Sequence, residues 1–236
     1  MAQLFLIRHG QASFGKANYD ALSELGAQQA QVMGKCLAAS IEPTQLICGS
    51  LNRQQQTMDN LLAGFESATE KKLALPIKVN PDFNEFDHEN VLEVFNPDFK
   101  DRAFMTQHIM AQKNPEKAFH KLYRQAVLQW LDAGSQNEAL TESFDGFYHR
   151  VNQAIDGIVQ NAQRQECIVV VSSAGAISMC LQKVLDISAV KAFELNEMMA
   201  NTAITRLVFN EVGDVNLSYF NNYQHLTLGD TKVTYR

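Results

Sequence analysis

The stretch LFLIRHG, residues 4–10, sets four apolar residues directly before an arginine, a histidine and a glycine. A short apolar run of this kind predicts a β-strand that is buried on both faces, as the strands of a parallel sheet are. Arg8 and His9 then stand where that strand ends. From these residues alone two interpretations stay open: an ordinary strand end meets solvent there, or the strand directs two functional side chains toward a ligand.

Strand and helix patterns alternate along the sequence that follows. The stretches TQLICGS (44–50) and IKVN (77–80) are strand candidates, and apolar residues at helical spacing fill the segments before and between them. Ser23 is placed to cap the first of these helices. This β-α-β-α-β order predicts an α/β fold, a three-layer α/β/α sandwich around a mostly parallel sheet.

The last third of the chain extends the same pattern. ECIVVVSSAG (166–175) predicts the central strand, and apolar spacing predicts helices over 142–164 and 174–185. TAITRLVFN (202–210) and VNLSYFNN (215–222) alternate apolar and polar residues, which predicts an antiparallel pair near an edge of the sheet.

The middle of the chain is different. From 81 to 134 no segment has a convincing strand pattern, and two Asn-Pro pairs interrupt it. Pro115 can begin a helix with an apolar stripe, and Gly134 fits its C-terminal cap. We therefore expect one domain over residues 1–236, with a helical insertion at about 81–140.

Composition narrows the partners and the compartment. The 236 residues are 46% hydrophobic, as in a globular protein, and the net charge of −6 argues against a nucleic-acid or membrane-surface partner. No apolar run approaches the ~18 residues of a membrane span, and the N-terminus lacks the basic region of a signal peptide. The sequence predicts a cytoplasmic protein.

The cysteines at 36, 48, 167 and 180 form no Cys-x-x-Cys pair, which predicts buried free thiols in a reducing compartment.

Three predicted strand ends carry unusual groups: residues 8–10, residues 49–50 with Arg53 one turn into the next helix, and residues 172–175. In open α/β sheets ligands gather beyond the carboxyl ends of the strands, so these groups converge if the strands are parallel neighbours. Guanidiniums grip phosphate oxygens, a helix N-terminus attracts anions, and a neutral imidazole is a competent nucleophile. The combination predicts a phosphate site that contains a histidine able to attack phosphorus.

A series of motifs in a fixed order resembles a known family. It comprises RHG after the first strand and then LSELGAQQA, SLNRQQQT, FNEFD, ESFDGFYHRV, VVVSSAGAI and YFNNYQHL. The series spans nearly the whole chain and resembles the phosphoglycerate mutase-like branch of the histidine phosphatase superfamily. That resemblance implies a phosphoglycerate mutase-like fold and phosphoryl transfer on a small phosphorylated substrate, with no metal or organic cofactor.

The resemblance also implies roles for single residues. His9 matches the nucleophile that becomes a phosphohistidine, and Arg8 and Arg53 match the arginines that clamp the phosphoryl group. Glu85 matches the acid that protonates the leaving oxygen and then activates water. The expected phosphate contacts around them are Gly10, Ser13, Ser173 and Ala174.

One departure concerns the second histidine, which the family places in a Ser-His-Gly-Gly pattern after the central strand. Ser173 stands at that position and can donate one hydrogen bond but no charge. Loss of such a stabiliser lowers a rate by roughly 10²–10³ unless another group replaces it. His88, three residues after Glu85, is a candidate replacement, and a loop or solvent-facing histidine is the other interpretation. No metal site is expected at 87–89, because adjacent loop residues rarely bind one ion.

A second departure lies in the loop after RHG, where Gln11, Ala12 and Gly15 replace the Glu-Ser and the asparagine of the mutase pattern. This difference argues against mutase activity on phosphoglycerates. We therefore predict hydrolysis of a phosphomonoester through a phosphohistidine at His9. The alternatives are a weakly active or inactive relative that binds phosphorylated ligands or a protein partner and, third, a phosphoglycerate mutase.

Overall fold

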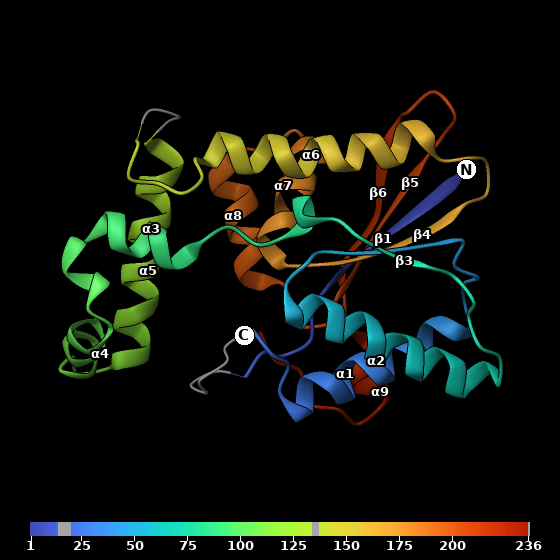
Figure 1. Cartoon of the computed structure of the whole chain (residues 1–236), viewed down its shortest axis with the longest axis horizontal. Coiled ribbons are helices and arrows are strands. Elements are labelled where there is room, and N and C mark those ends of the chain that lie inside the picture. The colour runs from blue at the N-terminus through green and yellow to red at the C-terminus, as the bar shows by residue number, and fades with distance from the viewer. Residues whose placement is uncertain (14–19, 134–136, 236) are drawn as a thin grey trace. The chain divides into compact units, whose positions relative to one another are not determined.

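The computed structural model describes residues 1–13, 20–133 and 137–235 of the chain. It contains a six-stranded sheet with the strand order β3-β2-β4-β1-β5-β6 (Figure 1). The strands are β1 (Ala2–Arg8), β2 (Gln45–Cys48), β3 (Ile77–Val79), β4 (Cys167–Ser172), β5 (Ile204–Phe209) and β6 (Val215–Asn222). The pairs among β1 to β4 are parallel, and the β1–β5 and β5–β6 pairs are antiparallel. This confirms the mostly parallel sheet with an antiparallel pair at one edge.

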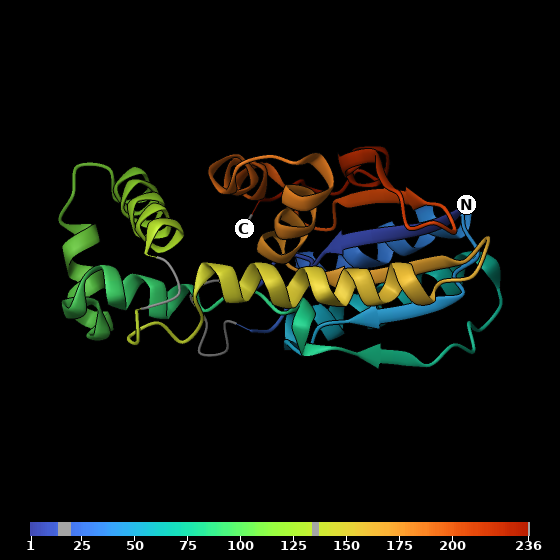
Figure 2. The same ribbon diagram turned by 90° about the horizontal axis from the view of Figure 1, so that it is seen from above.

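Helices cover both faces of this sheet (Figure 1, Figure 2). One face carries α1 (Glu24–Ala38), α2 (Asn52–Thr69) and α9 (Gln224–Leu228), and the other carries α7 (Ala174–Leu185), α8 (Ala189–Met198) and the part of α6 (Phe144–Asn161) from Val151 onward. Ser23 caps α1 as expected, because its side chain accepts the Gly26 N–H. The three-layer α/β/α sandwich is confirmed.

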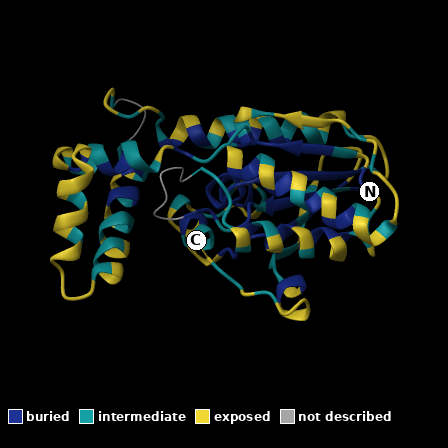
Figure 3. Ribbon diagram, turned by 60° about the horizontal axis from the view of Figure 1, so that its bottom comes forward, coloured by how far each residue is buried: buried dark blue, intermediate teal, exposed yellow. Residues whose placement is uncertain are grey.

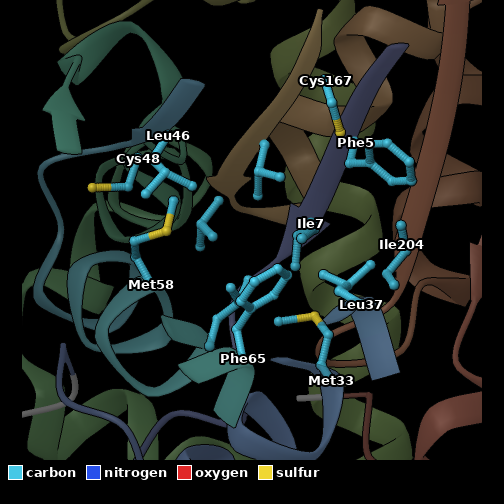
Figure 4. Close-up of a cluster of buried hydrophobic side chains, with 13 residues drawn as sticks. Phe5, Ile7, Met33, Leu37, Leu46, Cys48, Met58, Phe65, Cys167 and Ile204 are labelled. Atoms are coloured by element: carbon cyan, nitrogen blue, oxygen red, sulfur yellow. The ribbon is translucent and has the colours of Figure 1, made fainter. Parts of the chain in front are cut away.

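A buried apolar cluster lies between the sheet and the pair α1 and α2 (Figure 4). Phe5 and Ile7 of β1 contribute to it, as do Leu46 of β2 and Val169 and Val171 of β4. The helical members are Met33, Leu37, Met58, Leu61 and Phe65. All six residues of β4 are buried, which explains why that strand is apolar without alternation (Figure 3). Each fully buried aliphatic side chain of such a cluster stabilises the fold by about 1.5–3 kcal/mol.

The chain divides into two compact units, Met1–Glu85 with Val151–Arg236 and Phe86–Arg150. In the part of the second unit that the structure describes, every regular element is helical. These elements are α3 (His88–Phe95), a 3-10 turn (Pro97–Lys100), α4 (Arg102–Met110), α5 (Pro115–Asp132) and the start of α6. None of the helices in the described ranges of the chain is long and apolar enough to cross a membrane. The expected single domain with an inserted helical segment stays a prediction.

Aromatic side chains pack the second unit. Phe86 stacks on Trp130 with 4.6 Å between the ring centres, and Phe147 lies edge-on to Phe86 at 5.5 Å. Pro115 begins α5, as the sequence predicts, whereas Gly134 lies outside the described residues. The apolar stripe of α5 therefore serves packing.

The cysteines differ from the expectation at one position. All four thiols are free, but Cys36 is exposed, and only Cys48, Cys167 and Cys180 are buried. Met33 and Leu37 belong to the buried face of α1, and Cys36 lies at the margin of that face, where its side chain is exposed. The prediction that every cysteine is buried is therefore wrong for this thiol.

Candidate active site

The carboxyl ends of β1, β4 and β2 meet at one edge of the sheet, as the sequence predicts. In the parallel β1–β4 pair Arg8 is the register partner of Ser172, and in the β2–β4 pair Cys48 is the partner of Val171. The His9 N–H extends the first ladder by donating to the Ser172 carbonyl over 2.9 Å. The polar residues that follow these strands therefore lie next to one another.

Strand alternation decides which of these side chains face α2. Phe5 and Ile7 of β1 and Val171 of β4 all belong to the apolar cluster next to α1 and α2. Side chains two residues apart point to the same face of a strand, so His9 and Ser173 continue that side. The first turn of α2 lies on this side too, which brings its polar side chains to both residues.

His9 is buried, with 7% of its surface exposed, and both ring nitrogens have partners. Nδ1 donates to the Gly10 carbonyl over 2.7 Å, because a carbonyl oxygen only accepts. Nε2 accepts from Arg53 Nε at 3.3 Å. Burial lowers the pKa of His9 well below its ordinary value, and the Arg53 and Arg8 guanidiniums lower it further, against the opposing Gly10 hydrogen bond. His9 is thus a neutral imidazole whose Nε2 lone pair faces an arginine.

The backbone around His9 is held by two other parts of the chain. The Gly10 N–H donates to Thr57 Oγ1 of α2 at 3.0 Å. The Asn201 side-chain amide, just before β5, donates to the His9 carbonyl at 3.2 Å. These bonds fix the strand end from both sides, so the imidazole is carried by a rigid segment.

Two guanidiniums lie near this imidazole. Arg53 Nη1 forms an ion pair with Asp20 Oδ1 at 2.7 Å. Arg8 donates through Nη1 to the Met199 carbonyl. Since each guanidinium is held by acceptors within the protein, both cations are already in place near His9 before any ligand binds.

Glu85 lies at the start of α7. Its Oε2 accepts the Gly175 N–H at 3.0 Å. A Cβ atom on Gly175 would lie 1.9 Å from Glu85 Oε1, so only glycine admits the carboxylate at this distance. The N-terminus of α7, whose dipole favours negative charge, thus holds the candidate acid at the edge where the strands end.

The segment before this carboxylate is fixed to β4, to α2 and to the end of β2. The Phe83 carbonyl accepts from Ser172 Oγ at 2.7 Å and from Gln54 Nε2 at 3.0 Å. The Asn84 side chain accepts the Ser50 N–H at 2.7 Å and donates to Ser50 Oγ at 2.8 Å. These hydrogen bonds tie the two residues that precede the glutamate to Ser172, Gln54 and Ser50.

Two of the predicted phosphate contacts already have other partners. The Gly10 N–H donates to Thr57, and a Cβ atom at Gly10 would lie 2.4 Å from the Gly26 carbonyl oxygen. Close packing on α1 therefore requires a glycine there without any ligand. Ser13 Oγ donates to the Leu22 carbonyl at 2.9 Å, so the proton of this hydroxyl already has an acceptor within the protein.

The other two predicted contacts, Ser173 and Ala174, lie where β4 passes into α7 and are buried. Ser173 Oγ accepts from Gln54 Nε2 at 2.9 Å and does not cap α7. The structure thus brings these two residues to the same edge as His9 and Glu85.

His88 belongs to the second unit, where it begins α3. Its neighbours have structural partners, because Asp87 accepts the Asn90 N–H and Glu89 forms an ion pair with Arg102. In the part of the chain that the structure describes, no group of three His, Cys, Asp or Glu side chains is arranged to hold a metal ion. A catalytic role of His88 stays a prediction.

Besides Thr57 and Asn201, which hold the backbone around His9, three more side chains of this site were not predicted from the sequence. Asp20 pairs with Arg53, Gln54 joins α2 to β4, and Asn84 joins the glutamate segment to β2. Gln54 directly follows Arg53 and Asn84 directly precedes Glu85. For Gln54 and Asn84, this adjacency to a candidate residue was the signal that the sequence offered.

Comparison with solved structures finds the same fold. A mycobacterial glucosyl-3-phosphoglycerate phosphatase with inorganic phosphate is 18% identical, with 95% of this chain and 99% of that chain covered at a TM-score of 0.63. A phosphoserine phosphatase from Entamoeba histolytica with 3-phosphoglyceric acid is 18% identical, with 96% and 100% covered at a TM-score of 0.64. A phosphoglycerate mutase from Bacillus anthracis is 16% identical, with 97% and 96% covered at a TM-score of 0.62. At these identities the likeness establishes the fold.

Comparison of the sequence identifies the family. No curated protein was found to match the chain. The family described as the histidine phosphatase superfamily (branch 1) matches residues 4–222, from the first strand to the end of β6. This match confirms the resemblance carried by the motifs that begin with RHG. The chain therefore belongs to branch 1 of the histidine phosphatase superfamily.

Proposed function

We propose that the protein hydrolyses a small phosphomonoester through a phosphohistidine at His9. Its structural relatives are phosphatases and a mutase, so phosphoryl transfer is the chemistry that they share. Such a transfer depends on in-line positioning and charge neutralisation. His9, Arg8, Arg53 and Glu85 together offer both.

In the first step, His9 Nε2 attacks the phosphorus atom, and the bond from phosphorus to the leaving oxygen breaks as the N–P bond forms. Arg8 and Arg53 neutralise charge on the phosphoryl oxygens. Protonated Glu85 gives its proton to the leaving oxygen, so that an alcohol departs. The step ends with a phosphohistidine and an ionised glutamate.

In the second step, Glu85 takes a proton from a water molecule as the water oxygen attacks the phosphorus atom. The N–P bond breaks and inorganic phosphate leaves. His9 is then a neutral imidazole again, and the glutamate is protonated for the next cycle. Ser173 and the Ala174 N–H complete the contacts to the phosphoryl oxygens.

The state of His9 is the observation that supports this proposal best. A nucleophilic imidazole must be neutral, and its lone pair must lie on the attacking nitrogen. In His9, Nδ1 carries the proton that bonds Gly10, while Nε2 faces Arg53. The guanidinium beside Nε2 is placed to grip the oxygens of the phosphoryl group that this nitrogen attacks.

The test compares the wild-type chain with His9→Ala on p-nitrophenyl phosphate. We expect the wild type to release phosphate and to form an acid-labile phosphoenzyme, and His9→Ala to lose about 10³-fold or more in rate together with the phosphoenzyme. His120→Ala is the control, because this histidine is exposed. Equal rates for wild type and His9→Ala would refute the proposal.

A binding role is the second candidate function. The uncharged Ser173 and the Asp20 carboxylate on Arg53 both leave the site less positive than two free arginines and a second histidine would. A weakly active or inactive relative would bind phosphorylated ligands or a protein partner. Calorimetric binding of inorganic phosphate that needs Arg53, without turnover above the His9→Ala rate, would favour this candidate. Interconversion of phosphoglycerates would instead indicate a mutase.

A further inference from the structure

Gln54 is a fully buried amide in the first turn of α2, and its partners decide its orientation. Nε2 donates to the Phe83 carbonyl at 3.0 Å, and a carbonyl only accepts. Oε1 accepts the Leu51 N–H at 3.3 Å, and an amide N–H only donates. The second proton on Nε2 therefore goes to Ser173 Oγ, 2.9 Å away.

Ser173 receives this hydrogen bond one residue beyond the end of β4, beside His9. The preceding Ser172 is the register partner of Arg8, and Ser173 itself is fully buried. Its oxygen accepts from Gln54, does not cap α7, and its O–H donates to none of the residues that the structure describes. A serine hydroxyl has one proton to donate, so this proton remains for a ligand.

We propose that Gln54 is a positioning residue that turns the Ser173 hydroxyl toward a phosphoryl oxygen held beside His9. This inference rests on the proposed function, phosphoryl transfer at His9. Gln54 occupies one lone pair of Ser173 Oγ and thereby directs the O–H away from α2. A hydroxyl that accepts a hydrogen bond is also polarised, which strengthens the bond that it donates.

We call the pair of hydrogen bonds from Gln54 to Ser173 and from Ser173 to the phosphoryl oxygen the relay. The relay supplies a directed hydrogen bond without a charge, at the position where the resemblance places a histidine. Neither an amide nor a hydroxyl titrates between about pH 4 and 9, so the donation does not depend on pH there. Gln54 also holds the Phe83 carbonyl, two residues before Glu85. The Gln54 amide thus has a structural role as well, and the test must separate this role from the orientation of the Ser173 hydroxyl.

A double-mutant cycle on the full chain separates them, with p-nitrophenyl phosphate as substrate. Ser173→Ala removes the donor, and we expect kcat to fall by roughly 10²-fold with KM little changed. Gln54→Met removes the amide that orients this hydroxyl, and we expect kcat to fall by about 10-fold. In the Ser173→Ala background Gln54→Met should cost less than about 2-fold, because the hydroxyl that it directs is gone. An equal loss in both backgrounds would overturn the proposal, since a structural role costs the same with or without Ser173.

Gln55→Met is the matched control. Gln55 is the next residue of α2 and donates to the Ser50 carbonyl at 2.9 Å instead of to Ser173. We expect kcat within about 2-fold of the wild type. A loss as large as that of Gln54→Met would mean that any amide removed from this turn has the effect, and the proposal would fall.

Two more variants keep the test decisive if Gln54→Met folds poorly, which a thermal melt detects. Gln54→Glu has nearly the same shape, but its carboxylate accepts from Ser173 and turns the proton away, so kcat should fall at least about 10-fold. Ser173→Thr keeps a hydroxyl and should keep at least about a third of the wild-type kcat. Equal losses in Ser173→Thr and Ser173→Ala would overturn the relay.

The phosphohistidine distinguishes failure of the relay from failure of the proposed function. If His9→Ala keeps the wild-type rate, the proposed function fails whatever the other variants do. If His9 is phosphorylated while Ser173→Ala and Gln54→Met both react at the wild-type rate, only the relay fails.

Discussion

At the scale of single residues, burial is the largest influence on the pKa values of two histidines in the first unit. The pKa of His9 lies well below its ordinary value, and burial lowers the pKa of His225 to about 4. Thr202 Oγ1 donates to the Asn201 carbonyl, so His225 Nε2 must be the donor in its 3.0 Å contact with Thr202 Oγ1. Both imidazoles are neutral, but Nε2 is an acceptor in His9 and a donor in His225.

His225 makes the stability of the protein depend on pH. Between pH 6.5 and about 4 the unfolded chain binds a proton at this residue that the folded chain does not, so the free energy of unfolding falls as the pH is lowered. A shift from 6.5 to about 4 corresponds to about 3 kcal/mol. His225→Gln should make the decline shallower by up to this amount, as measured by urea unfolding at about pH 7 and 4.5.

His120→Gln is the control for this comparison, because His120 is exposed. Its free energy of unfolding should follow the wild type at both pH values. A decline in His225→Gln that is as steep as in the wild type would contradict the prediction.

At the scale of elements, the first turn of α7 carries a glycine that a helix does not favour. Alanine stabilises a helix interior by about 1 kcal/mol relative to glycine. At Gly175, however, a Cβ atom would lie 1.9 Å from Glu85 Oε1. We expect Gly175→Ala to displace the carboxylate and lower kcat by about 10-fold or more while the protein stays folded, with kcat and the thermal midpoint as measurements.

Gly157→Ala in α6 is the matched control, since a Cβ atom there meets nothing within 4 Å. This change should raise the stability by up to about 1 kcal/mol and leave kcat unchanged. If Gly175→Ala behaved in the same way, the glutamate would not need its place against α7.

The elements also show what could be predicted from the sequence. Strands such as β4 were predictable, because burial on both faces leaves an unbroken apolar run. Helix α8 was not predicted, since only Ala192 and Phe193 are buried in it and its apolar residues form no long stripe. Helix α4 has no buried residue at all within its described length.

The candidate site likewise contains residues that could be predicted from the sequence and a contact that could not. His9 and Arg53 were predictable, because a motif carries them at the ends of predicted elements. The contact from Gln54 to Ser173 was not, because it depends on β4 lying between β1 and β2, which only the complete sheet decides. The direction of a side-chain amide follows from such tertiary partners and leaves no periodic signal in the sequence.

At the scale of the whole chain, the C-terminal segment is tied to the first strand. Thr234 Oγ1 accepts from Gln29 Nε2 at 2.9 Å and donates to Asn201 Oδ1 at 2.8 Å. The same Asn201 donates through Nδ2 to the His9 carbonyl at 3.2 Å. Asn201 thus joins the last residues of the chain to the candidate nucleophile.

Thr234→Val tests this connection. It removes two hydrogen bonds, so we expect the free energy of unfolding to fall by about 2 kcal/mol and kcat to fall several-fold. Thr231→Val is the control in the same segment, because among the described residues its hydroxyl bonds only the Gly229 carbonyl. That variant should stay within about 0.5 kcal/mol of the wild type in urea unfolding. Equal effects of the two changes would show that the segment does not act on His9.

The strand order decides when this site can form during synthesis. β4 lies between β1 and β2 although the ribosome makes it long after both, and the other neighbour of β1, β5, is made later still. The apolar β1 therefore stays without a strand partner until Cys167–Ser172 has emerged. Such non-local pairing folds slowly and leaves apolar surface exposed to other chains in the meantime. A nascent chain released before β4 has neither a complete sheet nor a fixed place for His9, so the proposed activity requires that Cys167–Ser172 has been made.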